Sequence, residues 1–392
     1  MIDFELTEAQ ESLRLMTRDF VNREVRPSLG SREWVEEPEE RFPWELIEKG
    51  SRLGLRTLAI PEEWGGGGAD TLTICIVAEE LAVGDLGLAV CFDQTWKVSK
   101  LLVHIMNEDQ KKRFLPPFAA DHRFLLGTAQ AEPRGASDNI LPFDEPGAGV
   151  TLSAREEGEV FVLNGTKHFI SNGGVARLYI IYARTDRTVG IRKGLSAFLV
   201  PAESPGFSIG RIHDKMGQRF AQNAELVLED VRVPRENLLG KVNEAFTLRA
   251  PFVRGSNVEA AATVLGPARA AYEAALSHAR ERVQGGRPII EHQAVGLLLT
   301  EMFIGLEAAR NFIWKAAWAV DKGKPEARLL SSLAKVFVSE RAFEVTRQAM
   351  EVFGGMGYMR DAPVEKLWRD AASFLHSDGA NQVLRLRSVP IL

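Results

Sequence analysis

Apolar positions in the first third of the chain recur with the spacing of amphipathic helices. Thr7 and Gln10 have the spacing of a capping box, and the apolar residues that follow them repeat every three or four positions. After the glycine-rich segment 64–68, the same periodicity returns at Ile74, Val77, Ala78 and Leu81. We therefore predict that residues 6–122 are mainly helical.

The pattern changes between about Leu125 and Val233. Short apolar runs alternate there with Gly and Pro, as in an antiparallel β-barrel or sandwich. The pair Asn164–Gly165 separates the runs 160–163 and 166–170, and it tolerates the positive φ of a tight turn, which predicts a hairpin. Three further runs are strand candidates: 178–182, 195–200 and 225–228.

Helical periodicity resumes after Asn243 and predicts a four-helix bundle. One long helix carries a seam of apolar residues: Val295, Leu299, Met302, Leu306, Ala309, Ile313 and Ala316. A second helix, from about 326 to 353, should end at Gly354–Gly355. Pro251 and Pro267 should start, kink or break the helix between them.

The order of these patterns predicts an α+β protein. At 392 residues the chain is long enough for two or three domains. The expected domains are an N-terminal helical domain (1–122), a middle antiparallel β-barrel or sandwich domain (123–234) and a C-terminal helical bundle (235–392).

Composition narrows the class of protein. The hydrophobic content of 45% and the charged content of 26% are ordinary for a soluble globular chain, and a net charge of −5 gives no reason to expect nucleic-acid binding. Cys75 and Cys91 lie in apolar contexts without CxxC spacing, as buried thiols in a reducing compartment do. No apolar run has the length of a signal segment or membrane span. We expect a cytoplasmic protein and no metal site.

Four segments carry motifs whose order and spacing are more specific than any one of them alone. They are 131–138 (Ala-Glu-Pro-Arg-Gly-Ala-Ser-Asp), 167–174 (Lys-His-Phe-Ile-Ser-Asn-Gly-Gly), 216–219 with 229–234, and 352–358 with 363–370. Together they resemble the acyl-CoA dehydrogenase family over nearly the whole chain. The resemblance implies an FAD-dependent enzyme that oxidises an acyl-CoA thioester, passes electrons to an electron-transfer flavoprotein and assembles as a homotetramer.

The resemblance places the flavin ring between the β domain and the bundle. Groups at Gln130, Ala131 and Ser171 would hydrogen-bond its edge, although Ser171 could equally form a strand-end hydrogen bond. Ser137 resembles a residue that contacts the thioester ligand and the cofactor, and its alternative is ordinary turn chemistry. Phe169 stands where the family usually has a tryptophan beside the flavin, which leaves the contact with an electron acceptor open.

Other cofactor contacts by resemblance lie in the bundle. Arg282, with Gln284 and Gln293, resembles the segment that reaches the neighbouring subunit's flavin diphosphate, a role that suits the arginine fork. A surface arginine is the alternative, and Gly285 replaces the aromatic that the family usually has. The remaining positions are Glu351, Gly354, Gly355, Ala380 and Gln382. The two glycines would allow close backbone approach, and they can also cap a helix.

Asp378 occupies the position where most family members have the glutamate base. A thioester α-proton leaves only when the carbonyl oxygen is polarised and a carboxylate faces the α-carbon. Family geometry implies that Asp378 is this base, that Gly379 borders the substrate and that the flavin takes hydride from the β-carbon. The alternative is that Asp378 caps the helix beginning near Ala380. Some members place the base on the first bundle helix, but the stretch 254–257 has no carboxylate, and Glu259 differs in helical phase.

Asp93 is a second carboxylate, which by resemblance lies on the helix lining the acyl pocket. It could pair with Lys97, four residues on, or act as a second base and substrate contact. Two aspartates around a ring favour an alicyclic carboxyl-CoA, of cyclohexane or cyclohexene type, as substrate. The alternatives are a branched-chain or aryl acyl-CoA, a flavin oxidase, monooxygenase or desulfinase on the same fold, and a non-enzymatic acyl-CoA-binding or scaffold protein.

Overall fold

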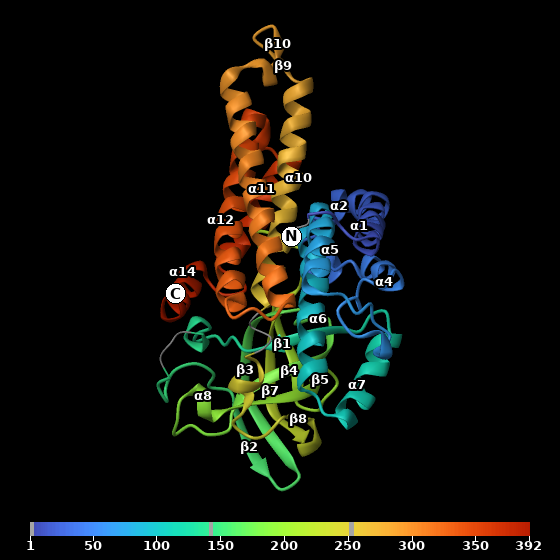
Figure 1. The fold of residues 1–392 in the computed structure, drawn as a ribbon. Coiled ribbons are helices and arrows are strands. Elements are labelled where there is room, and N and C mark those ends of the chain that lie inside the picture. Colours follow the sequence, from blue (N-terminus) through green and yellow to red (C-terminus); the bar gives the residue numbers. More distant parts are fainter. Residues whose placement is uncertain (1–3, 141–143, 251–254) are drawn as a thin grey trace.

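A computed structural model of the chain describes residues 4–140, 144–250 and 255–392, apart from the side chain of Ser31. Two helical regions lie side by side, and a sheet lies across one end of the longer one (Figure 1). Pro251, one of the two prolines expected to shape the helix after it, lies outside the described residues. No helix among the described residues combines the length and apolar composition that a membrane crossing needs.

The N-terminal region is helical, as the periodicity predicted. Its main helices are α1 (Glu8–Phe20), α2 (Arg26–Arg32), α3 (Pro38–Arg41), α4 (Trp44–Arg52), α5 (Thr71–Gly84), α6 (Leu86–Ile105) and α7 (Glu108–Ala120). The capping box at Thr7 and Gln10 is confirmed, because each side chain bonds the other residue's backbone N–H. Asp85 ends α5 and caps α6 through a bond from the N–H of Leu88, so the two helices meet at a sharp corner.

The middle region is built on one mixed sheet. Its strands are β1 (Leu125–Ala129), β2 (Ser153–Glu157), β3 (Val160–Ser171), β4 (Ala176–Arg184), β5 (Leu195–Pro201), β6 (Phe207–Ile212), β7 (Asn223–Pro234) and β8 (Leu238–Leu239). The strand order is β6-β7-β3-β2-β4-β5-β8, with β1 parallel to β4 and most other pairs antiparallel. The α+β class is confirmed, and the sheet stays open between β6 and β8.

The predicted hairpin at Asn164–Gly165 is wrong. β3 runs through both residues, and the turn that precedes it lies at Gly158, where φ is +61°. β7 pairs with β3 on both sides of Asn164–Gly165, and the register shifts between Leu163 and Gly165. The side chain of Asn164 bonds Asp230 on β7. A conformationally permissive pair can serve a bulge as well as a turn, and the long partner strand selected the bulge.

The C-terminal region is a bundle of long helices. It comprises α10 (Ser256–Glu281), a small hairpin of β9 (Val283–Gln284) and β10 (Arg287–Pro288), α11 (Gln293–Asp321), α12 (Ala327–Phe353), α13 (Pro363–Ala372) and α14 (Asn381–Ser388). The seam of α11 is buried from Leu299 to Ala316, and α12 ends at Gly354 with φ +59°. Pro267 lies inside α10, which continues to Glu281 rather than ending there.

Close packing of α5 against α10 joins the two helical regions. A Cβ added at Gly266 would lie 2.4 Å from the Cβ of Ala82, so only glycine permits this approach. Arg269 of α10 reinforces the contact by pairing with Glu79 and Glu80 of α5. This packing fixes the position of α6 relative to the start of α10. The candidate site lies between these two segments.

The domain boundaries at 122/123 and 234/235 stay a prediction.

Candidate active site

The loop before α14 presents Asp378 to the interior of the protein. Asp378 has a φ of +51°, in the left-handed region that few non-glycine residues adopt. Its carboxylate Oδ1 lies 2.9 Å from Lys97 Nζ. The N-cap of α14 is Ala380, without any side-chain capping bond. The alternative that Asp378 caps this helix is therefore wrong, and its unusual backbone serves to direct the carboxylate toward α6.

Lys97 joins the two aspartates that the sequence singled out. Its Nζ also lies 2.6 Å from Asp93 Oδ2, one helical turn earlier on α6. The side chains of Lys97 and Asp93 are each 3% exposed, whereas that of Asp378 is 29% exposed. Of the two alternatives for Asp93, pairing with Lys97 is present, and the same lysine also bonds Asp378. A role for Asp93 as a second base stays a prediction.

Burial dominates the electrostatics of this cluster. It raises the pKa of Asp93 to about 7, because the charged form loses its hydration, while Lys97 opposes the shift. Burial alone would lower the pKa of Lys97, but the charges of Asp378 and Asp93 raise it above the ordinary lysine value. Asp93 Oδ1 has no hydrogen-bond partner among the described residues. The cluster thus keeps its lysine charged and can take up or release a proton at Asp93 near neutral pH.

Two buried side chains of the bundle hold the Asp378 loop. Asn257, at the start of α10, donates from Nδ2 to the backbone oxygen of Asp378 (2.8 Å). Lys335, on α12, donates from Nζ to the backbone oxygen of Gly379 (2.8 Å) and to Asn381 Oδ1 (2.9 Å). Burial lowers the pKa of Lys335 to about 8. We did not predict these residues from the sequence. The available signal was a lysine on the buried face of α12, in phase with Ser331 and Ser339.

Replacing Lys335 by methionine should loosen the loop that carries Asp378. The backbone oxygen of Gly379 would lose its charged donor, and an unmet buried acceptor costs about 1–3 kcal/mol. The side-chain oxygen of Asn381 would keep only the bond from Ser339. We expect a lower free energy of unfolding and a lower kcat, measured by denaturant unfolding and steady-state kinetics. Lys315→Met, at an exposed position of α11, is the control. Unchanged kcat in Lys335→Met would show that the anchor does not position Asp378.

Glu259 lies in the first turn of α10, as Asn257 does, but it has a different partner. Its side chain is fully buried and pairs with Lys100 on α6. One carboxylate oxygen, Oε2, has no hydrogen-bond partner among the described residues. Glu259 thus faces α6 beside the cluster without bonding either aspartate, and Asp378 remains the better candidate base. Arg254, in the stretch examined for an alternative base, lies outside the described residues.

The residues expected at the flavin edge lie where β1, β3 and the bundle meet. Gln130 and Ala131 follow β1, and Gln130 Nε2 is a buried donor without a partner among the described residues. Phe169 has a φ of +56° and is 61% exposed, an aromatic face open to a ligand. Ser171 Oγ accepts from Asn223, the strand-end bond that was its alternative reading. Ser137, in the short helix Ser137–Asn139, is exposed. An unpaired amide donor and an exposed aromatic ring fit the edge and the face of a flavin.

A second group of expected cofactor residues lies at the far end of the bundle. Arg282, Gln284 and Gln293 are exposed around the β9–β10 hairpin, which stands farthest from the sheet (Figure 1). Glu351 and Gly354 line a nearby open hollow of about 430 Å³. A Cβ added at Gly354 or Gly355 would meet no atom within 4 Å, so the backbone there is accessible.

These two groups are separated by the length of α10. Asn257, at its first turn, touches Asp378, whereas His278, near its last turn, stacks on Phe353 with ring centroids 4.2 Å apart. At about 1.5 Å per residue the two contacts lie roughly 30 Å apart along the helix. Ala380 and Gln382 belong to the first group, because they stand at the start of α14 beside Asp378.

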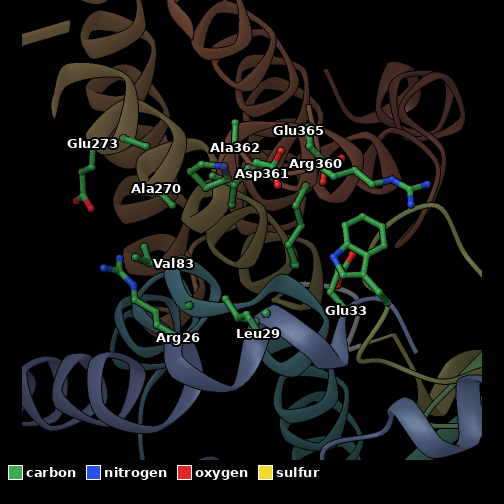
Figure 2. Close-up of a pocket in the computed structure, with 17 residues that line it drawn as sticks. Arg26, Leu29, Glu33, Val83, Ala270, Glu273, Arg360, Asp361, Ala362 and Glu365 are labelled. Carbon is green, nitrogen blue, oxygen red and sulfur yellow. The ribbon is translucent and has the colours of Figure 1, made fainter. Parts of the chain in front are cut away.

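A hollow larger than the one of about 430 Å³ lies elsewhere. A cavity of about 560 Å³ opens between α2, α5, α10 and α13, where Arg26 and Leu29 face Glu273, Arg360 and Asp361 across the opening (Figure 2). None of the predicted catalytic or cofactor residues lines it. Its lining combines apolar side chains with charges of both signs, among them Arg26, Glu273 and Asp361. Size alone therefore does not identify the active site of this molecule.

This order of a helical region, a sheet and a helical bundle is the architecture of a class of flavin-dependent dehydrogenases. Three family models match the chain: the acyl-CoA dehydrogenase N-terminal domain at 7–122, the middle domain at 127–231 and the C-terminal domain at 256–389. The chain belongs to the acyl-CoA dehydrogenase family. It is an FAD-dependent oxidoreductase, and the open aromatic and unpaired amide described above fit that cofactor.

Three similar proteins illustrate the range of this family. The short-chain specific acyl-CoA dehydrogenase of Clostridium acetobutylicum is 35% identical over 98% of each chain. The cyclohexane-1-carbonyl-CoA dehydrogenase of Geobacter metallireducens is 37% identical over 85% of each chain. A chain in the solved structure described as the electron transferring flavoprotein of Acidaminococcus fermentans is 34% identical, covers 100% of both chains and has a TM-score of 0.92.

Proposed function

We propose that this acyl-CoA dehydrogenase oxidises an alicyclic carboxyl-CoA thioester of cyclohexane or cyclohexene type. The observation that carries the proposal is the convergence of Asp93 and Asp378 on Lys97, which sets one buried and one partly exposed carboxylate at the same lysine. A single proton abstraction needs only one of them. The 37% identity to a cyclohexane-1-carbonyl-CoA dehydrogenase supports the same substrate class.

Asp378 is the proposed base for the first proton. Its carboxylate is partly exposed, and Asn257 and Lys335 hold its loop from behind. The backbone that carries the carboxylate is therefore fixed, and a thioester α-carbon can approach the carboxylate from its solvent-exposed side. The proton moves from that carbon to Asp378, while FAD, when bound, supplies the acceptor for hydride from the β-carbon. Proximity favours an acyl group that comes close to this shorter carboxylate.

Asp93 is the proposed base for a second proton, further along the ring. Its pKa of about 7 lies near the operating pH, where a base is most effective. The positive charge of Lys97 lies between the carboxylates of Asp93 and Asp378 and reduces the repulsion between them. After the first desaturation, a second removal of proton and hydride would give a conjugated ring. Re-oxidation of FAD by an electron acceptor must occur between the two steps.

Asp93→Asn should separate ring substrates from linear ones. We expect a loss of about 10²-fold or more in the second oxidation of a ring thioester and little change with butyryl-CoA, since a general base contributes roughly 10²–10⁴. The wild-type rate of the ring step should rise with pH around 7, because Asp93 must lose its proton before it can accept another. Product analysis and pH profiles would check both results. Full activity of Asp93→Asn on every ring substrate would remove the second base from the mechanism.

A short-chain acyl-CoA dehydrogenase is the second candidate function. It is favoured by the 35% identity to the Clostridium enzyme over 98% of the chain. Anaerobic bleaching of the bound flavin by a panel of thioesters distinguishes the candidates. Faster bleaching by cyclohexane-carboxyl-CoA supports the alicyclic assignment, and faster bleaching by butyryl-CoA supports the short-chain one. Branched-chain and aryl thioesters belong in the same panel, and oxygen consumption would reveal an oxidase.

We also propose an electron-transfer flavoprotein as the acceptor and a homotetramer in the cytoplasm as the working form. The similarity to a chain in an electron transferring flavoprotein structure supports the acceptor. The separation of the two cofactor groups along α10 supports the assembly, because Arg282, Gly354 and their neighbours would then contact the partner subunit's FAD. Size-exclusion chromatography with light scattering tests the assembly.

A further inference from the structure

Three potential metal ligands converge on the sheet beside Phe169. His168 lies on β3, Glu225 lies on β7, and His213 directly follows β6. Each offers one ligand atom, and these atoms all lie within 4.8 Å of one another. No other group of three or more His, Cys, Asp or Glu side chains comes this close within the described parts of the chain. No local motif marks this site, because its members are far apart along the chain.

Two bulges at the same residue create the convergence. On one side of β7, Lys167 pairs with Leu226 and Ile170 with Ala224, so two residues of β3 oppose Glu225 alone. On the other side, Ile209 pairs with Leu226 and Ile212 with Ala224, so two residues of β6 oppose the same glutamate. Bulges redirect side chains and are frequent beside functional sites. Here both neighbouring strands are redirected around Glu225.

The bulge in β3 reverses the alternation of its side chains. Lys167 and Ile170 are both buried, whereas a regular strand would place residue 169 on the same face as residue 167. Phe169 instead points outward with a φ of +56°. The ring of His213 lies 4.7 Å from the rings of both His168 and Phe169, measured between centroids. The backbone distortion thus brings both imidazoles to one place.

The two imidazole nitrogens of this group are shielded from solvent but lack hydrogen-bond partners among the described residues. His168 Nδ1 and His213 Nε2 have almost no solvent contact, and neither forms a hydrogen bond among the described residues. His168 Nδ1 lies 3.0 Å from Glu225 Oε1, close enough for charge attraction but without hydrogen-bond geometry. A buried polar atom without a partner is costly, and a bound cation would satisfy both nitrogens. The backbone N–H of Arg211 donates to Glu225 Oε2 (3.3 Å) and orients the carboxylate.

The backbone on both sides of the cluster is fixed. The N–H of His168 donates to the oxygen of Ala131 (2.9 Å), and the N–H of His213 donates to the oxygen of Asn223 (2.9 Å). Movement needed for metal binding is therefore confined to the side chains. Bonds of about 2.0–2.2 Å to zinc place ligand atoms roughly 3.3 Å apart. Side-chain rotations that move the ligand atoms by about 1–2 Å therefore suffice.

We propose that His168, His213 and Glu225 bind a zinc ion. Two imidazole nitrogens and one carboxylate oxygen form a set that zinc accepts, with water in the fourth position of a tetrahedral site. The ion would tie β3, β6 and β7 together and fix Phe169, the aromatic expected beside FAD. The proposal does not depend on the acyl substrate. Its rival is a His168–Glu225 ion pair against which His213 merely packs.

Zinc titration of the holoenzyme tests this site. The protein should be freed of any affinity tag, stripped with a chelator and titrated with zinc chloride by calorimetry. We expect one zinc ion per chain and a higher melting temperature, because zinc binds the folded state. His213→Gln and Glu225→Gln should each weaken binding by about tenfold or more, since each removes one of three ligands. Cobalt substitution should give the visible absorption of a four-coordinate site, and the variants should lose it.

His122→Gln is the matched control. His122 Nδ1 is also buried without a partner among the described residues, but His122 belongs to no ligand cluster. This variant should bind zinc as the wild type does. Absence of zinc uptake by the stripped wild type, or equal uptake by wild type and His213→Gln, would overturn the proposal. The flavin absorption spectrum of each variant verifies that the protein is folded and loaded with FAD.

Discussion

Asp378→Asn should reduce the rate of flavin reduction by every thioester by about 10²–10⁴-fold, the usual contribution of a general base. Asparagine has nearly the same shape as aspartate and can still accept the bond from Lys97, so the fold and the loop should persist. It cannot take up the α-proton. Rapid mixing of the enzyme with thioester, followed at the flavin absorption band, measures this step directly.

Asp378→Glu is the informative companion to that variant. It restores the side chain usual in the family and extends the reach of the carboxylate by about one C–C bond. We expect it to retain activity and to shift preference from ring thioesters toward linear ones.

Bound flavin and thioester affinity, measured by absorption and by ligand-induced spectral change, should be unchanged in Asp378→Asn. Wild-type flavin reduction in Asp378→Asn would mean that another group removes the proton.

Lys97→Met should be among the most destabilising single changes in the chain. Lys97 is the shared partner of Asp93 and Asp378, and removal of one member of a buried ion pair costs about 3–5 kcal/mol. The carboxylate of Asp93 would be left in a site that disfavours its charge, and its pKa should rise further. Equilibrium unfolding in denaturant, with bound flavin monitored in parallel, measures the loss.

The double variant Lys97→Met/Asp93→Asn separates charge from packing. It removes both charges, so it should recover part of the free energy of unfolding that Lys97→Met loses.

The free energy of unfolding of Lys97→Met should depend on pH in a defined direction. A carboxyl whose folded pKa exceeds its unfolded value binds more protons when folded, so Lys97→Met should lose further stability as pH rises through that folded pKa. Equal stability of the single variant and the wild type would show that the bridge carries no net energy.

The broad architecture followed from local patterns. Helical periodicity located α1, α5, α11 and α12, and short apolar runs located β4, β5 and β7, because each pattern is set by residues that are near one another in sequence. The hairpin predicted at Asn164–Gly165 was wrong for the same reason, because that prediction used only neighbouring residues. Its local signal permits either a turn or a bulge, and pairing with the distant strand β7 selected the bulge.

Only part of the candidate site could be predicted from the sequence. Asp378 and Asp93 stood out as carboxylates in motif or apolar contexts, and Lys97 was visible as a helical neighbour of Asp93. Its bond to Asp378 joins residues 281 positions apart and leaves no local trace. Lys335 and Asn257 were missed because their role is to hold a distant loop by its backbone.

The α+β class, the resemblance to acyl-CoA dehydrogenases and the importance of the two aspartates could be inferred from the linear chain, because periodicity and motif order are local properties. The folded arrangement was needed to show that one buried lysine bonds both aspartates and that two bulges bring His168, His213 and Glu225 together. Such sites depend on the register of paired strands and on the packing of α5 against α10. Both are set by contacts between distant segments, which no local pattern encodes.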